Sequence, residues 1–178
     1  MKKVLIIVSS PRENGNSDRL CRQFAKGAEE TGNKVETIYL RDKKINFCKG
    51  CSVCRTTHRC VQDDDMAEIL DKVVKSDVIV LSTPVYFYIM NGQMKTFIDR
   101  CLPRYEEISN KEYYFICTSV DPVRAVIEKT LSGLRDFTDD CLDNCIERGV
   151  ICGIDTAVKG AIEDTPAYER AYEIAKNI

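Results

Sequence analysis

The sequence predicts a single α/β domain in which helices cover both faces of a parallel sheet. Three observations lead to this prediction. Short apolar segments of strand length alternate along the chain with longer segments whose apolar residues recur at helical spacing. The strand-like segments are nearly continuous in apolar residues, which is typical of strands buried on both faces. The 178 residues contain no repeat, low-complexity tract or linker, so one domain spanning residues 1–178 is expected.

The expected strands and helices follow one another in regular order. Strands are expected over Lys3–Val8, Lys34–Tyr39, Val78–Ser82, Tyr113–Ser119 and Val150–Ile154. Helices are expected over Ser17–Glu30, Met66–Lys75, Met94–Arg104, Val123–Cys145 and Ala167–Asn177. The second of these helices carries Ile69, Leu70 and Val73 at the spacing of one buried face.

Ligands of such a sheet bind beyond the carboxyl ends of the strands, where the strand order reverses. The loops that leave the first, third and fourth strands are Ser9–Ser17, Thr83–Gln93 and Thr118–Val123. We therefore expect these three loops to meet at one site.

The first of these loops is a polar turn that runs directly into a helix. The unpaired N–H groups and the dipole of a helix N-terminus attract an anion. Gly15 allows close approach of a ligand, Arg12 offers a charge-assisted fork, and Ser10 adds a hydroxyl. Asn16 and Ser17 supply further donors, and one of them is expected to cap the helix. The turn predicts a phosphate site; an ordinary capped turn is the alternative.

The second loop is rich in aromatic residues although it should lie at the surface. Residues 83–92 include Tyr86, Phe87 and Tyr88. A flat apolar wall beside a phosphate site suits a planar heterocycle with a phosphorylated tail, whereas packing of the loop under a helix is the alternative. The three aromatic side chains also suggest a homo-oligomer that buries this face.

Composition excludes several classes of protein. The net charge is −2 and no basic stripe is present, which argues against nucleic acid as a partner. No apolar run reaches membrane-spanning length, so no membrane association is expected. Ten cysteines in a chain without an export signal indicate reduced thiols, metal binding or redox chemistry in the cytoplasm.

Three segments carry a family resemblance through their order and spacing. They are Ser10–Arg12 followed by Gly15–Ser17, then Pro84–Phe87, then GQMKTFIDR at residues 92–100. Together they resemble the NADPH-dependent FMN reductase family, and the resemblance extends along nearly the whole chain. It implies a flavodoxin-like three-layer sandwich with a five-stranded parallel sheet in the order 2-1-3-4-5. Ser9 stands where the family usually has Gly, which should tighten the turn without abolishing phosphate binding.

The resemblance also implies a cofactor, a reaction and a binding site. Hydride would pass from NAD(P)H to N5 of bound FMN, and then to a quinone, free flavin, nitro or azo acceptor. No side chain is assigned as a general acid or base. By resemblance, the FMN phosphate is held by Ser10, Arg12, Asn16 and Ser17. The ring is lined by Pro84, Val85, Tyr86 and Phe87, bordered by Asn91 and Gly92, and approached on its other edge by Thr118, Ser119 and Asp121.

A second motif consists of Cys48, Cys51 and Cys54, followed by Cys60. Three cysteines at C-x2-C spacing can converge on one point, and a fourth nearby completes four thiolates, which suits an iron–sulfur cluster better than zinc. The spacing also resembles that of the iron–sulfur flavoproteins, in which four cysteines bind a [4Fe–4S] cluster that exchanges electrons with FMN. Such a protein would carry electrons between protein partners. Empty or oxidised thiols are the alternative.

The acidic run Asp63–Asp65 precedes an expected helix and is interpreted as a solvated helix start. His58, the only histidine, is expected to be a solvated loop residue.

The remaining cysteines give weaker signals. Cys21, Cys101 and Cys117 fall at core-facing positions, where a free cysteine behaves as a small apolar residue. Cys141 and Cys145 are expected to lie one helical turn apart, which would permit a shared metal, although two separate thiols are favoured.

Missing motifs exclude two other classes of protein, and a third class stays open. A low-molecular-weight tyrosine phosphatase or arsenate reductase needs C-x5-R, and no cysteine here has Arg six residues later. A dinucleotide-binding Rossmann domain needs G-x-G-x-x-G after the first strand, whereas this loop has one glycine. A flavodoxin-type electron carrier stays open, although such carriers are usually strongly acidic.

Overall fold

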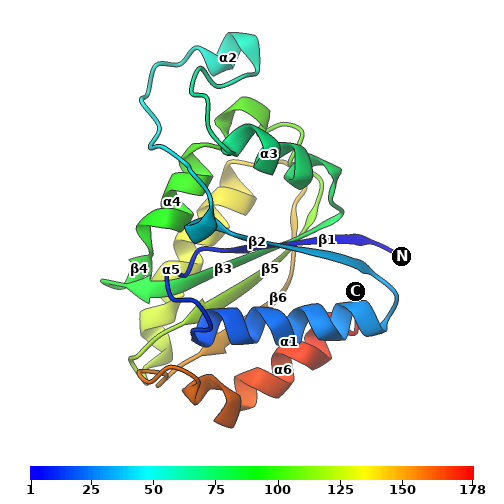
Figure 1. The fold of residues 1–178 in the computed structure, drawn as a ribbon, viewed down its shortest axis with the longest axis vertical. Helices are drawn as coiled ribbons and strands as arrows, with labels where there is room; N and C mark the ends of the chain where they lie inside the picture. Colours follow the sequence, from blue (N-terminus) through cyan, green and yellow to red (C-terminus); the bar gives the residue numbers. More distant parts are fainter.

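The computed structural model describes residues 1–178, and its centre is a five-stranded parallel sheet (Figure 1). The strands are β1 (Lys3–Val8), β2 (Lys34–Tyr39), β3 (Val78–Tyr86), β5 (Glu112–Thr118) and β6 (Ile146–Gly153). Their spatial order is β2-β1-β3-β5-β6. Counted along the parallel strands this is 2-1-3-4-5, which confirms the predicted flavodoxin-like order.

Helices cover both faces of the sheet, as predicted. One face carries α1 (Asn16–Glu30) and α6 (Pro166–Ala175), and the other carries α3 (Met66–Lys75), α4 (Gly92–Asp99) and α5 (Arg124–Arg135) (Figure 1). Alternate residues of each strand point to opposite faces, so β1 sends Ile6 to the core under α1 and Ile7 to the core under α3, α4 and α5. Gly27 allows α1 and α6 to approach closely, because a Cβ there would lie 2.3 Å from the carbonyl oxygen of Tyr172.

Four predicted elements differ from the structure by four or more residues at one end. The helix expected over Met94–Arg104 ends at Asp99, and the strand expected from Val150 begins at Ile146. The third strand does not end at Ser82: β3 continues to Tyr86 and pairs with a short antiparallel strand, β4 (Ile89–Met90). The helix expected over Val123–Cys145 ends at Arg135 and is followed by a π-helical turn, Asp136–Asp140. Asn144 has a left-handed backbone (φ 52°), which interrupts a helix, and β6 begins two residues later.

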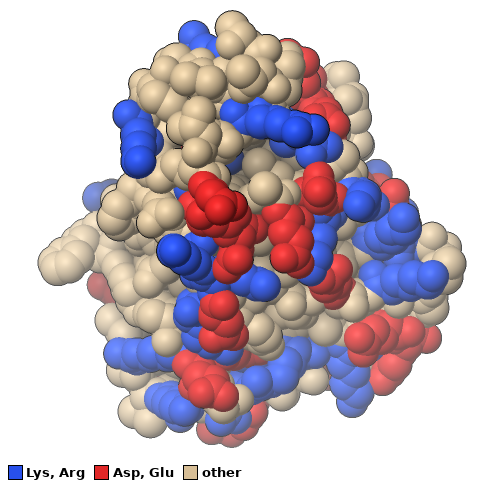
Figure 2. Space-filling model, turned by 45° about the horizontal axis from the view of Figure 1, so that its top comes forward, with Lys and Arg blue, Asp and Glu red and all other residues tan.

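Short turns complete the fold. They are the 3-10 turns Leu40–Asp42, Leu102–Arg104 and Ala161–Asp164, and the single helical turn α2 (Cys54–Thr57). The segment carrying α2 projects away from the body at the top of Figure 1. None of the helices combines the length and the apolar composition needed to span a membrane. In Figure 2, basic and acidic residues intermingle over the face shown, with no broad field of one sign.

Candidate functional site

A cavity of about 240 Å³ lies at the carboxyl ends of the parallel strands. All three loops predicted to meet here contribute to it, and the loop after β6 adds Thr156, which the sequence analysis did not identify. Its lining residues are Ser10, Arg12, Asn16, Ser17, Pro84, Val85, Tyr86, Phe87, Thr118, Ser119, Val120 and Thr156. Ten of the thirteen residues assigned to the cofactor by resemblance are therefore neighbours in space.

The polar turn positions the first helix at one end of the cavity. Gly15, rather than Asn16 or Ser17, is the N-cap of α1, and no side chain caps the helix. Gly15 donates its N–H to the carbonyl of Arg12, and a Cβ on Gly15 would lie only 3.0 Å from that oxygen. The predicted side-chain cap is thus wrong. The N-cap position falls on Gly15, which has no side chain, and the tight turn leaves little room for one. The first N–H groups of α1 have no intrahelical acceptor and face the turn.

Asn16 and Ser17 mainly hold neighbouring loops in place. The Asn16 amide donates to the carbonyls of Thr156 (2.8 Å) and Val158 (3.0 Å), and its oxygen accepts from the N–H of Gly160 (2.9 Å). The Ser17 hydroxyl lies 2.8 Å from that of Thr118. These contacts tie α1 to the loop after β6 and to the end of β5, and they leave Asn16 with few free donors.

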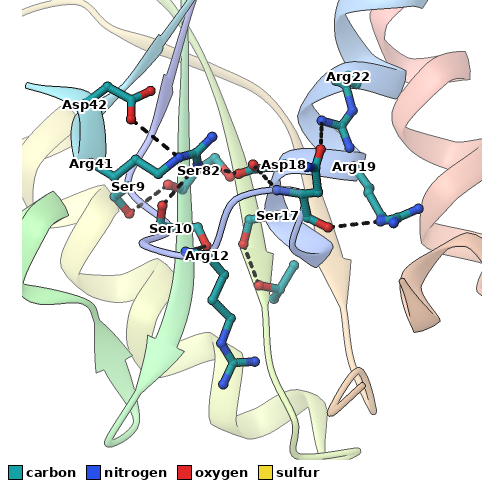
Figure 3. Close-up of polar contacts among 12 residues, drawn as sticks. Ser9, Ser10, Arg12, Ser17, Asp18, Arg19, Arg22, Arg41, Asp42 and Ser82 are labelled. Atoms are coloured by element: carbon teal, nitrogen blue, oxygen red, sulfur yellow. Dashed lines mark hydrogen bonds and ion pairs between the residues drawn. The ribbon is translucent and has the colours of Figure 1, made fainter. Parts of the chain in front are cut away.

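Arg12 is the cation of the site whose side chain has no partner within the protein. Its side chain is exposed and forms no hydrogen bond or ion pair with the protein. Figure 3 shows it extending away from the neighbouring arginines and carboxylates. A guanidinium in this position can form charge-assisted hydrogen bonds to an anion in the cavity.

An ion pair between Arg41 and Asp18 holds the polar turn in place, and the sequence analysis missed it. Arg41 donates to Asp18 (3.0 Å) and to the carbonyl of Ser10 (3.3 Å) (Figure 3). It also lies over the ring of Tyr39 (4.2 Å). Asp18, whose side chain is 1% exposed, also accepts from the N–H of Asn14 (2.9 Å). Arg41 could have been identified, since β2 ends beside β1 at the same edge of the sheet.

An aromatic hairpin forms the wall of the cavity. β3 and β4 are joined by Phe87 and Tyr88, both with left-handed backbones (φ 49° and 70°). Tight hairpins of this kind normally use Asn or Gly, so two aromatic residues here indicate a strained loop of the sort that occurs at functional sites. Phe87 is 99% exposed, so no contact within the chain requires it.

Three of the residues assigned by resemblance lie outside the cavity lining. Asn91 is buried, caps α4 by accepting from the N–H of Met94, and donates to the carbonyl of Ser9 (2.7 Å). Gly92 opens α4. Asp121 accepts from the N–H of Val123 in the loop after β5. Asn91 therefore links the start of α4 to the polar turn and holds the turn in place.

The four motif cysteines lie on one excursion, here called the cysteine loop (residues 47–63). Cys48 and Cys51 are exposed, Cys54 and Cys60 are partly buried, and none forms a disulfide. Burial raises the pKa of the Cys54 thiol, and the nearby Cys60, Cys51 and Cys48 raise it further. No three metal-binding side chains of the structure converge closely enough to hold a metal ion.

The interpretation of Asp63–Asp65 as solvated is wrong for its middle residue. The side chain of Asp64 is 0% exposed and forms a two-point ion pair with Arg100. Burial alone would raise the pKa of Asp64, but hydrogen bonds from Arg100, Asn46 and Met66 outweigh it and lower the pKa to about 2. The acidic run thus contains a structural carboxylate.

The predictions for His58 and for the cysteines outside the loop are confirmed in part. Cys21, Cys101 and Cys117 are buried as predicted, and burial raises the pKa of Cys21 to about 12, so it is inert. His58 is an exposed loop residue, also as predicted. Cys141 and Cys145 do not share a helix, because the chain leaves helical geometry after Asp140.

Comparison with known proteins identifies a family. The sequence model of NADPH-dependent FMN reductases matches residues 2–135. An iron–sulfur flavoprotein of Archaeoglobus fulgidus is 44% identical over 101 residues, which cover 57% of this chain and 46% of that protein. The chain thus matches about half the length of that relative. An iron–sulfur flavoprotein of Methanosarcina thermophila is 29% identical over 99% of this chain and 93% of its own length.

Solved structures show the same fold at low sequence identity. An azoreductase of Bacillus anthracis superposes with a TM-score of 0.76 at 16% identity, covering 100% of both chains. An NAD(P)H:quinone oxidoreductase of Methanothermobacter marburgensis gives 0.75 at 15% identity, covering 99% of this chain and 96% of the other. At these identities the likeness concerns the fold alone.

Proposed function

The chain belongs to the NADPH-dependent FMN reductase family, and we propose that its carboxyl-edge cavity binds FMN and passes reducing equivalents from NAD(P)H to a small acceptor. It is a flavin-dependent oxidoreductase by membership of that family. The single observation that supports the location is the juxtaposition, in one cavity, of an unpaired guanidinium, a helix N-terminus and an aromatic wall.

The residues of the cavity fit the two ends of FMN. Arg12, the Ser10 hydroxyl and the first N–H groups of α1 form an anion-binding end. Pro84, Val85 and the aromatic hairpin form a flat apolar end. When bound, FMN supplies the hydride-accepting chemistry, and the protein binds the phosphate, orients the ring and excludes water from one of its faces. No proton-transferring side chain is needed for hydride transfer.

Steady-state assays under anaerobic conditions test this proposal. FMN-loaded protein is mixed with NADH or NADPH, and the acceptors are a quinone, free FMN, a nitroaromatic and an azo dye. Turnover with at least one acceptor is expected, and heat-denatured protein with the same FMN content is the control. Absence of turnover with every pair would contradict a reductase and favour an electron carrier.

Replacing Phe87 by Ala should change the flavin rather than the fold. We expect a shifted absorption envelope and midpoint potential, because the ring would gain contact with water. Folding should persist, since Phe87 is 99% exposed. Absorption spectra and redox titrations of the two FMN-loaded proteins measure the effect. Tyr105→Ala, at another exposed aromatic residue, is the matched control. Identical spectra and potentials in Phe87→Ala and wild type would place the ring elsewhere.

The cysteine loop favours a second function, that of an iron–sulfur flavoprotein that transfers electrons to a redox protein. Cys48, Cys51, Cys54 and Cys60 form a set of four unpaired thiols on one loop, which suits a [4Fe–4S] cluster. Relatives named iron–sulfur flavoproteins support the same proposal. Because the sulfurs do not converge in the structure, cluster binding requires the loop to draw them together.

Cys51→Ala should abolish iron binding. After anaerobic reconstitution, wild type should contain about four irons per chain with matching sulfide. Cys51→Ala should contain far less, because a missing thiolate leaves one iron without a protein ligand. Iron and sulfide analysis beside flavin content is the measurement, and Cys145→Ala, outside the loop, should match wild type. A flavin-loaded, reconstituted wild type without iron would refute the cluster.

A further inference from the structure

Arg100 is an unusual residue of the core. It follows the last residue of α4 (Gly92–Asp99), and its side chain is 2% exposed. Its Nη1 and Nη2 atoms lie 2.8 and 2.9 Å from the two carboxylate oxygens of Asp64, whose side chain is fully buried. Burying such a pair has a large desolvation cost, and apolar residues often provide equal stability. The pair therefore calls for a role beyond stability.

The same guanidinium reaches both ends of the cysteine loop. Nη1 donates to the carbonyl of Asn46 (2.6 Å), the residue before the loop, and Asp64 follows the loop directly. Nη2 lies 3.5 Å from Sγ of Cys60, within reach of an N–H···S contact. The remaining nitrogen, Nε, is buried without a partner. All hydrogen bonds of the Arg100 guanidinium thus go to the cysteine loop or to the residues that flank it.

The base of the loop is closed by further hydrogen bonds. Asp64 accepts from the N–H (3.0 Å) and the side-chain amide (3.2 Å) of Asn46. Further out from the loop, the backbone N–H of Lys44 donates to the Asp65 carboxylate (2.7 Å), and Asp65 donates its own N–H to the carbonyl of Lys44 (3.0 Å). The loop therefore leaves and re-enters the body at one point, as in an Ω-loop, and Arg100 lies at that point.

Helix α4 connects this base to the proposed FMN cavity. At its N-terminus, Asn91 donates to the carbonyl of Ser9 in the polar turn (2.7 Å). At its C-terminus, Arg100 holds the cysteine loop. Eight helical residues span about 12 Å, so one short helix joins the residue that holds the polar turn to the residue that holds the cysteine loop.

We propose that Arg100 is the positioning residue of the cysteine loop: it holds both ends of the loop and directs a hydrogen-bond donor at Cys60. The inference rests on the proposed cluster-binding function, since Cys60 is one of the four proposed ligands. If the loop draws the four sulfurs together with Cys60 still beside Nη2, this donor would stabilise the more negative reduced form of a bound cluster, so the expected consequence is an effect on reduction potential. Loss of the donor should lower the potential.

Iron-free protein gives the first test. Amide hydrogen exchange at the base of the loop, at the hydrogen-bonded N–H groups of Asn46, Asp65 and Met66, should become about tenfold faster or more in Arg100→Met, while exchange in β1 and β3 stays as in wild type. Arg100→Lys retains the charge without the fork and should give an intermediate rate. Arg135→Met, which removes a two-point pair with Glu147 that makes no hydrogen bond to the loop, should leave the loop unchanged. Unchanged exchange in Arg100→Met would overturn the proposal that Arg100 holds the ends of the loop. If that variant does not fold, Asp64→Asn replaces it in the same measurement.

Reconstituted protein gives the second test. The cluster potential should be lower in Arg100→Met than in wild type, with Arg100→Lys between them, and FMN affinity should be unchanged. Equal potentials in all three proteins would overturn the proposed donor to Cys60. A wild type that binds FMN but no iron would refute the cluster itself, and the exchange measurement would then still decide whether Arg100 holds the loop.

Discussion

Arg12→Ala is expected to weaken FMN binding about ten- to a hundredfold. Arg12 has no partner in the protein and lines the cavity beside the α1 N-terminus, so its replacement removes a contact to the phosphate without disturbing another interaction. A hydrogen bond between charged groups contributes about 1.5–3 kcal/mol, which corresponds to this range of affinity. Fluorescence quenching during titration of apo-protein with FMN measures the dissociation constant.

A control variant distinguishes the loss of a direct contact with the phosphate from the loss of one positive charge. Lys26→Ala removes the same charge from the exposed side of α1 and should leave the affinity nearly unchanged. Equal affinities for Arg12→Ala and Lys26→Ala would mean that the phosphate does not contact Arg12.

Asp18→Ala should destabilise the protein by about 3–5 kcal/mol, because Arg41 would remain partly buried without its carboxylate. The carboxylate also holds the N–H of Asn14 in the polar turn, so FMN affinity should fall as well. Urea unfolding of the apo-protein measures the stability, and the FMN titration measures the affinity.

Asp42 provides the control within the same cluster. It lies 3.8 Å from Nε of Arg41, and its side chain is 65% exposed. Exposed pairs contribute about 0–1 kcal/mol, so Asp42→Ala should unfold almost like wild type. If both variants unfolded at the same urea concentration, the buried pair would have no special part in holding the turn.

Regular elements could be predicted because their signals are local. The apolar strands and the spacing of residues such as Ile69 and Leu70 depend on near neighbours in the chain, and the strand order came from resemblance. Breaks in a pattern were harder to predict. The helix after Val123 ends early, where the apolar spacing continues further than the helical backbone does. β3 runs on through Tyr86 because Thr83 and Pro84 pair with β5, and Val85 and Tyr86 pair with β4.

The candidate site was predicted where strand ends determine it and missed where distant side chains pair. The three loops meet because parallel strands end at one edge of the sheet. The pairs Arg41–Asp18 and Arg100–Asp64 join residues 23 and 36 positions apart, and no local pattern marks them. Asn16 lines the predicted cavity, and its side-chain amide also bonds to backbone groups about 140 residues away, a contact that only the tertiary structure creates.

Anaerobic titration of FMN-loaded protein with NADPH tests the central claim most directly. If the cavity holds FMN for reduction by a nicotinamide, the oxidised flavin absorption should disappear in proportion to NADPH added. The purified protein should contain about one FMN per chain, and Arg12→Ala should lose its FMN on dilution. Protein that binds no FMN, or whose bound FMN stays oxidised with both NADPH and NADH, would contradict the account.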